Sequence, residues 1–168
     1  MKDIVVTSDD TLIFDGKEYK CAIGKNGFTK QKQEGDLKTP LGCFSIKKVF
    51  YRPDTMDAPK TDIPVVALNI DDGWCDDPDD EKYNQFVKMP YKSSAENLWR
   101  DDEIYDLIVD LGFNDDPPIA GAGSAIFFHV ARSNYSGTAG CVAVNKKDLL
   151  EILSKLKPGM NLCIQPND

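Results

Sequence analysis

The chain's single histidine lies twelve residues before a cysteine in the stretch HVARSNYSGTAGCVAV. A cysteine thiol has an ordinary pKa of about 8.5, so it needs a base before it becomes an effective nucleophile at neutral pH. His129 could take the proton of Cys141 and later return it to a leaving amine. The residue types are therefore compatible with a catalytic pair of nucleophile and base.

The segment that joins the two residues suits this chemistry. It contains Asn, Ser and Gly, which allow a loop that folds back, and Ala139 and Gly140 leave space before the sulfur. Backbone N–H groups around Gly140 and Cys141 are expected to face a developing oxyanion. Structural roles stay open, because a histidine near a strand end and a cysteine before Val-Ala-Val are both common core residues.

Alternation and apolar runs predict a mainly β protein of the α+β class. Together, the predicted elements form a β-sandwich or mixed sheet, with one C-terminal helix packed against it and long loops. Asn145 can cap the helix, its apolar stripe includes Leu149 and Leu153, and Pro158 with Gly159 ends it. Strands are predicted in DIVVTS, TLIFDG, GKEYKCAIG, GCFSIKKVF, PVVALNI, IYDLIVDLGF, SAIFFHVA and MNLCIQ, with SAIFFHVA as a central strand buried on both faces.

The middle of the chain, residues 52–90, is rich in proline and acidic residues. DDGWCDDPDDEKYN is predicted to be a solvated acidic loop, and it lacks the spacing of an EF-hand. Because this loop contains Trp74, a role for the loop in facing the substrate stays open. SAENLWRDD is predicted to form one or two helical turns.

Size, charge and cysteine content narrow the class of protein. A chain of 168 residues suits one domain, residues 1–168, and the formal net charge of −8 argues against nucleic acid as a partner. No segment reaches membrane-spanning length. The five cysteines show no CxxC spacing, so we expect no metal site, and their odd number leaves at least one thiol free. Cys21, Cys43 and Cys163 have apolar neighbours and are expected to be buried hydrophobic residues.

Several motifs of this chain resemble the YkuD-type L,D-transpeptidases. SAIFFHVARSNYSGTAGCVAV is similar to their active-site segment, with His129, Thr138, Gly140 and Cys141 at matching positions. EGDLKTPLGCF is similar to their TPxGxF hairpin, and FYRPD, GWCDDPDDEKYN and SAENLWRDDEIYDLIVDLGFND resemble one branch of the family. The chain departs from the pattern at Ala139, where the family usually has a second His, and at Ala143, where it usually has Arg or Asn.

The resemblance implies an enzyme that acts on peptidoglycan stem peptides. Cys141 would attack the carbonyl before a terminal D-amino acid, His129 would act as base, and an amine of a second stem would resolve the thioester. The resemblance also implies that the carbonyl of Val130 orients the imidazole and that Thr138 contacts substrate. The acidic loop that holds Trp74 would contact a cationic amine of the substrate, with Trp74 as a substrate-binding residue. No metal and no organic cofactor are expected.

Two alternatives stay open at this stage. Water could resolve the thioester, which would make the protein an L,D-carboxypeptidase or amidase with the same pair. Alternatively, the domain could bind cell-wall peptides without catalysis, which the changes at Ala139 and Ala143 would allow. The resemblance implies the periplasm or cell envelope, whereas MKDIVVTSDDTLIF lacks the long apolar stretch of a signal peptide, so a cytoplasmic location also stays open.

Overall fold

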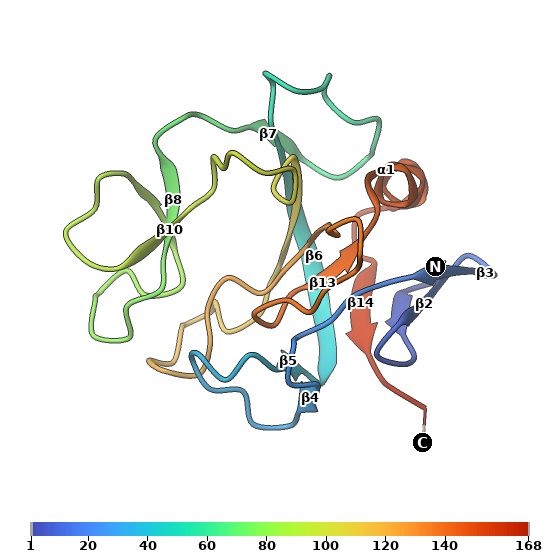
Figure 1. The fold of residues 1–168 in the computed structure, drawn as a ribbon, viewed down its shortest axis with the longest axis horizontal. Coiled ribbons are helices and arrows are strands. Elements are labelled where there is room, and N and C mark those ends of the chain that lie inside the picture. Colours follow the sequence, from blue (N-terminus) through green and yellow to red (C-terminus); the bar gives the residue numbers. More distant parts are fainter. Residues whose placement is uncertain (1, 168) are drawn as a thin grey trace.

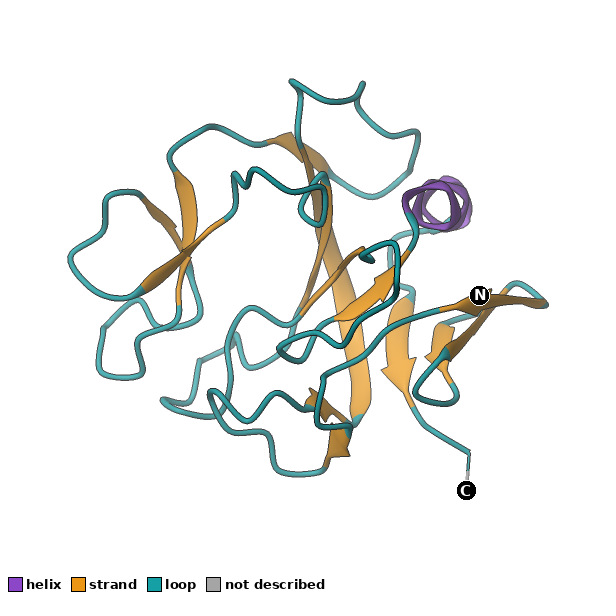
Figure 2. Ribbon diagram, in the orientation of Figure 1, coloured by secondary structure: helices purple, strands orange, loops and turns teal. Residues whose placement is uncertain are grey.

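The computed structural model describes residues 2–167, and its regular elements are almost all strands joined by long loops (Figure 2). It contains one helix, α1 (Lys146–Lys155). The strands are β1 (Ile4–Val6), β2 (Thr11–Phe14), β3 (Lys17–Lys20), β4 (Phe28–Thr29), β5 (Thr39–Pro40), β6 (Gly42–Tyr51), β7 (Val65–Ala67), β8 (Asp72–Cys75), β9 (Phe86–Lys88), β10 (Ala95–Asn97), β11 (Leu107–Leu111), β12 (Phe127–Val130), β13 (Val142–Val144) and β14 (Asn161–Ile164). The predicted mainly β, α+β class is confirmed.

A nine-stranded mixed sheet forms the body of the protein. Its order is β13-β12-β11-β6-β14-β1-β2-β3, and β7 pairs with β6 outside this path. The long strand β6 joins the two halves, because it pairs antiparallel with both β11 and β14 (Figure 1). The pairs β1–β14, β12–β13 and β6–β7 are parallel.

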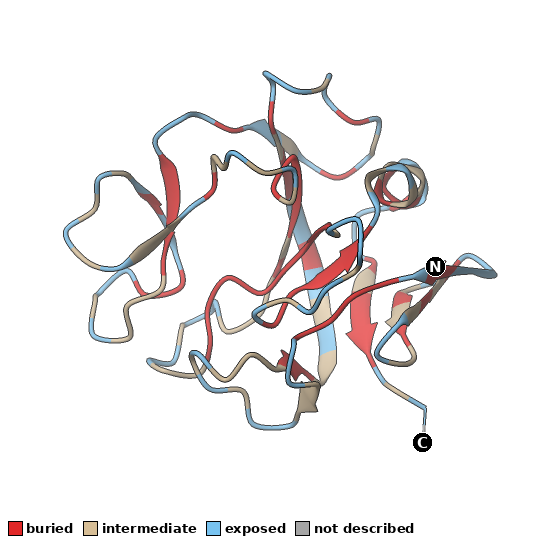
Figure 3. Cartoon of the chain, viewed as in Figure 1, coloured by how far each residue is buried: buried red, intermediate tan, exposed pale blue. Residues whose placement is uncertain are grey.

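The strands in the middle of this sheet bury both faces, as the apolar run SAIFFHVA predicted. All four residues of β12 and all three of β13 are buried, and β13 is red in Figure 3. Alternate residues of β12 belong to different clusters: Phe128 and Val130 join the main core, whereas Phe127 joins a second cluster with Trp74 and Cys141. Cys141 therefore lies on the face of the sheet that carries the second cluster, and the main core lies on the opposite face.

Helix α1 covers the first of these faces, and the sequence prediction for it is confirmed. Asn145 caps it by accepting the N–H of Asp148 at 2.8 Å. Leu149, Ile152 and Leu153 are fully buried against the sheet. No helix among residues 2–167 combines the length and apolar composition that crossing a membrane would require.

A separate three-stranded sheet, β10-β8-β9, corrects two predictions for the middle of the chain. The acidic stretch was expected to be a solvated loop, but β8 at its start is buried along its whole length. The helical turns expected in SAENLWRDD are also wrong, since β10 pairs antiparallel with β8 through Glu96 and Trp74. These strands are stabilised by hydrogen bonds to another strand, which a segment's own sequence does not predict.

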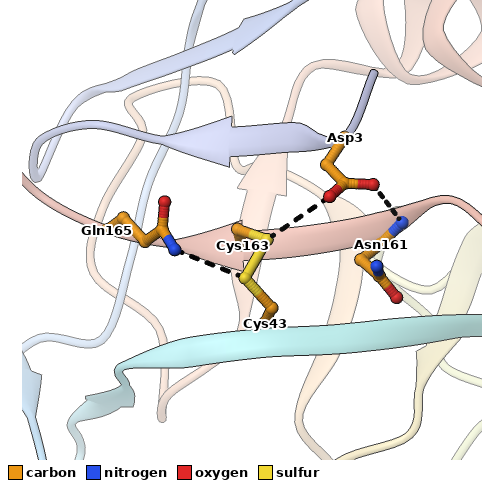
Figure 4. Close-up of a disulfide and its surroundings, with 5 residues drawn as sticks. All are labelled: Asp3, Cys43, Asn161, Cys163 and Gln165. Atoms are coloured by element: carbon orange, nitrogen blue, oxygen red, sulfur yellow. Dashed lines mark hydrogen bonds between the residues drawn. A yellow bond between two sulfur atoms is a disulfide. The ribbon is translucent and has the colours of Figure 1, made fainter. Parts of the chain in front are cut away.

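A disulfide also corrects the sequence analysis. Cys43 on β6 and Cys163 on β14 are directly opposite each other and are bonded (Figure 4). Cys43 is exposed, and its sulfur accepts a hydrogen bond from Nε2 of Gln165 at 3.4 Å. Cys21, Cys75 and Cys141 are free and buried.

Candidate active site

The parallel pairing of β12 and β13 brings Cys141 and His129 onto one face of the sheet. In this register His129 is opposite Ala143, and Phe128 is opposite Val142. Cys141, two residues before Ala143, therefore lies on the same side as His129 in the neighbouring strand. Both side chains line a cavity of about 360 Å³.

The Cys141 thiol is held by the backbone that leads into β12. Its Sγ lies 3.1 Å from the carbonyl oxygen of Ala125, to which it donates, and accepts the N–H of Phe127 at 3.3 Å. Only 6% of Cys141 is exposed. Burial raises the pKa of its thiol to about 12, so in this structure the sulfur carries its proton at neutral pH.

The imidazole of His129 is fixed from two sides. Nδ1 lies 2.9 Å from the carbonyl oxygen of Val130, and because a carbonyl can only accept, Nδ1 carries the proton and Nε2 is left as the basic nitrogen. The ring of Tyr105 packs edge-on against the imidazole, with 5.3 Å between centroids. Burial lowers the pKa of His129 to about 4, so the imidazole is neutral at neutral pH.

Thr138 and Gly140 shape the loop, residues 131–141, that crosses from β12 to β13. The Thr138 hydroxyl donates to the carbonyl of Cys141 at 2.7 Å and accepts the N–H of Gly140 at 3.0 Å. That N–H is thus already bound in this structure and is not free to face an oxyanion, contrary to the sequence expectation. Gly140 has a φ of +140°, and its carbonyl accepts the hydroxyl of Thr39, the Thr of the TPxGxF-like segment, at 2.8 Å.

Trp74 lies away from this cavity. Its indole packs edge-on against Phe127 at 5.1 Å between centroids, and Nε1 donates to Asn84 at 2.9 Å. It lines a different cavity together with Asp110. The expected contact between Trp74 and substrate therefore has no support in this geometry, because β8 carries the indole into the core beneath Phe127.

The cavity also contains charged residues to which the sequence analysis gave no role. Lys32, Glu34 and Asp76 come from loops, Glu96 comes from β10, and further members are Arg100 and Arg132. Burial raises the pKa of Glu96, which accepts a hydrogen bond from the Tyr105 hydroxyl. Glu34, Asp76, Glu96, Arg100 and Arg132 all lie in stretches that carry the resemblance, whereas Lys32 lies just before one of them and had no sequence signal.

The described residues show no cluster suited to a metal ion. Among residues 2–167 no three His, Cys, Asp or Glu side chains are grouped as ligands. The convergent groups of the cavity are instead a thiol, a neutral imidazole and fixed charges, which is the set that acyl transfer uses.

These features define a class: a β-rich protein with a thiol and an imidazole on adjacent parallel strands of a charged cavity. The model of the L,D-transpeptidase catalytic domain, YkuD, matches residues 2–164. The chain therefore belongs to the YkuD family of L,D-transpeptidase catalytic domains.

A search of curated proteins found no match. The solved structure of Bd1075 from Bdellovibrio bacteriovorus is 15% identical, with a TM-score of 0.49, over 96% of this chain and 46% of that one. The present chain thus spans less than half of that protein.

Proposed function

We propose that this protein is a cysteine acyltransferase that acts on peptidoglycan stem peptides, with Cys141 as nucleophile and His129 as general base. Family membership supports the reaction class. The observation that carries the residue assignment is the shared cavity, into which neighbouring parallel strands place the chain's one imidazole and a free thiol.

The proposed first half-reaction transfers an acyl group to sulfur. Nε2 of His129 takes the Cys141 proton while Sγ attacks the carbonyl that precedes a terminal D-amino acid, and the C–O π electrons move to oxygen. Collapse of this adduct re-forms the carbonyl and breaks the C–N bond, and the imidazolium protonates the departing amine. An amine of a second stem then attacks the thioester, which gives the cross-link and restores the thiol.

The burial of both groups supports proton transfer during attack rather than a preformed ion pair. The pKa of Cys141 is raised to about 12 and that of His129 is lowered to about 4, both chiefly by burial. At neutral pH the resting pair is thus thiol and imidazole. The Val130 carbonyl, 2.9 Å from Nδ1, can stabilise the imidazolium as it forms.

The test is an acyl-enzyme experiment with a synthetic tetrapeptide stem that ends in a D-amino acid. Intact-protein and peptide mass should show the tripeptide acyl group on Cys141 of the wild type. Cys141→Ala should show none, and Cys75→Ala, which removes another buried free thiol, should label as the wild type does. Labelling at Cys75 or Cys21, or labelling that survives Cys141→Ala, contradicts the assignment.

The same incubation distinguishes the fate of the thioester. With an amine acceptor present, a cross-linked product supports transpeptidation. Release of the trimmed stem alone indicates an L,D-carboxypeptidase with the same pair. Stem binding that is unchanged in Cys141→Ala, with no acyl adduct under any condition, would mean that the domain only binds cell-wall peptides.

A further inference from the structure

Lys32 is a buried cation in the cavity that holds Cys141 and His129. It lies between β4 and β5, and its side chain is only 5% exposed. Lysine is rarely buried to this extent unless it has a partner, because removing an ammonium from water is costly. The structure therefore contains a specific arrangement that keeps this charge inside the cavity.

Two glycines make room for the Lys32 side chain. The Cβ of any other residue at position 123 would lie 2.7 Å from Lys32 Cγ, and a Cβ at position 140 would lie 3.3 Å from Nζ. The ammonium thus lies beside Gly140, which directly precedes Cys141. Since the N–H of Gly140 already donates to Thr138, Lys32 supplies a donor at a place where that backbone group is occupied.

Asp36 anchors the ammonium. Its carboxylate pairs with Lys32 Nζ and accepts the N–H groups of Gln33 and Lys38, each at 2.9 Å. Burial opposes the charged form, but the ammonium of Lys32 and these two N–H groups hold the pKa of Asp36 below its ordinary value. The carboxylate is therefore fixed by its own loop, and it fixes Lys32 in turn.

We propose that Lys32 is a charge-stabilising residue for the nucleophile: its ammonium stabilises the sulfur anion of Cys141 as His129 removes the proton, and then the oxyanion of the tetrahedral adduct. The inference rests on the proposed function. Lys32 keeps its three protons throughout. The proton of Cys141 passes to His129 and then to the leaving amine, so the ammonium acts only through its field and hydrogen bonds.

The other charges around Cys141 show why a cation is needed there. Burial raises the pKa of the thiol, the N–H of Phe127 lowers it, the carboxylate of Glu96 raises it, and the ammonium of Lys32 lowers it. Arg100 and Arg132 also line the cavity, but both pair with the carboxylate of Asp102, at 2.8 Å and 3.5 Å. The remaining titratable groups that line it are Glu34, Asp76, Tyr105 and His129.

The test measures the reactivity of the thiol itself. Iodoacetamide labelling of Cys141 is followed against pH by peptide mass, with Cys21 and Cys75 as internal references. Lys32→Met keeps the length of the stem and removes the charge, so labelling at a fixed pH should slow about tenfold, which corresponds to one unit of thiol pKa. Lys30→Met, an exposed position in the same loop, should not change it.

Asp36→Asn should act in the opposite direction. It removes the anion and leaves the ammonium uncompensated in the cavity that holds the sulfur, so labelling of Cys141 should become faster than in the wild type. This second variant decides the question if Lys32→Met fails to fold, which circular dichroism would reveal.

The outcomes separate the inference from the function on which it rests. Wild-type labelling rates in folded Lys32→Met, or slowed or unchanged labelling in Asp36→Asn, overturn the role of Lys32 and leave the Cys141–His129 pair in place. A wild-type Cys141 that neither labels at any pH nor forms an acyl adduct overturns both.

Discussion

At the scale of single residues, the site combines a thiol and an imidazole that are both kept neutral by burial. The hydrogen bond from Nδ1 of His129 to the Val130 carbonyl sets the tautomer, so the chain needs no acidic side chain in that position. The protonation states of these two groups determine the pH dependence expected for the proposed reaction and the loss of rate expected when His129 is replaced.

The first prediction concerns the acid limb of kcat/KM, which reports the free enzyme. A base must be unprotonated to act, and burial holds the pKa of His129 at about 4 rather than 6.5. Activity should thus stay level as the pH falls through 6.5 and decline only near pH 4. A rate–pH profile measured with the stem tetrapeptide checks this, and an acid limb near pH 6.5 would mean that the imidazole is solvated.

The second prediction concerns the removal of the proposed base, His129. His129→Gln keeps a similar volume and loses the proton acceptor, so kcat/KM should fall by about 10²–10⁴-fold while the fold is retained. Acyl-enzyme formation in single-turnover mixing measures the loss. If His129→Gln acylated at the wild-type rate, another group would have to be the base.

At the scale of elements, strand β11 carries a largely buried carboxylate, Asp110, and ionising it there destabilises the folded state. Asp110 is opposite Lys48 of β6, and burial is the main reason that its pKa rises to about 6 from 3.8. Since the folded state binds this proton more tightly than the unfolded state, Asp110 makes the protein less stable as the pH rises from about 4 to 6.

The third prediction follows from that sign. Asp110→Asn should raise the free energy of unfolding at pH 7 by about 1–2 kcal/mol, discounted for partial exposure, and the gain should vanish below pH 4. Urea titrations at both values measure it, with the exposed Asp101→Asn as control. A gain that is equal at the two pH values would point to a cause other than titration.

The fourth prediction concerns the disulfide between β6 and β14. It closes a sequence separation of 120 residues, which restricts the unfolded chain. The double variant Cys43→Ser, Cys163→Ser should lose about 2–4 kcal/mol of unfolding free energy but retain labelling at Cys141. Urea unfolding of the oxidised wild type and the variant measures this, and equal midpoints would show that strand pairing alone holds these two strands.

The elements that could be predicted are those whose sequence pattern lies within the element itself. The cap at Asn145 and the leucine stripe lie within one helix, and the apolar run of β12 reports its own burial. By contrast, β8 and β10 are short segments without an alternating pattern that form strands by pairing within the small sheet, β8 with both β9 and β10. Pairing of the cysteines on β6 and β14 cannot be deduced from spacing. The position of Lys32 beside Gly140 is equally non-local.

At the scale of the whole molecule, Asn84 connects the small sheet to the segment behind Cys141. Its Oδ1 accepts both the indole N–H of Trp74 at 2.9 Å and the N–H of Ala125 at 3.0 Å. Its Nδ2 donates to the carbonyls of Phe113 and Asn114. The Ala125 carbonyl in turn accepts the Cys141 thiol, so this amide supports the position of the sulfur.

The fifth prediction tests that connection. Asn84→Ala leaves the N–H groups of Trp74 and Ala125 buried without a partner, which should cost about 2–4 kcal/mol of stability. Thermal unfolding measures the loss. Cys141 in the folded variant should also show altered labelling by iodoacetamide, whereas unchanged stability would mean that water or a neighbour replaces the amide.

The loop of residues 131–141 joins two parallel strands without a helix, although such crossovers usually contain one. Ala131, Arg132, Ser136 and Gly137 line the cavity that the loop crosses. Thr138, Gly140 and Cys141 at its end hold the proposed nucleophile, so residues 132–137 are the part of the loop that is open to variation. Grafting longer or differently charged versions of residues 132–137 would then show whether this part of the loop selects the donor peptide of the proposed reaction.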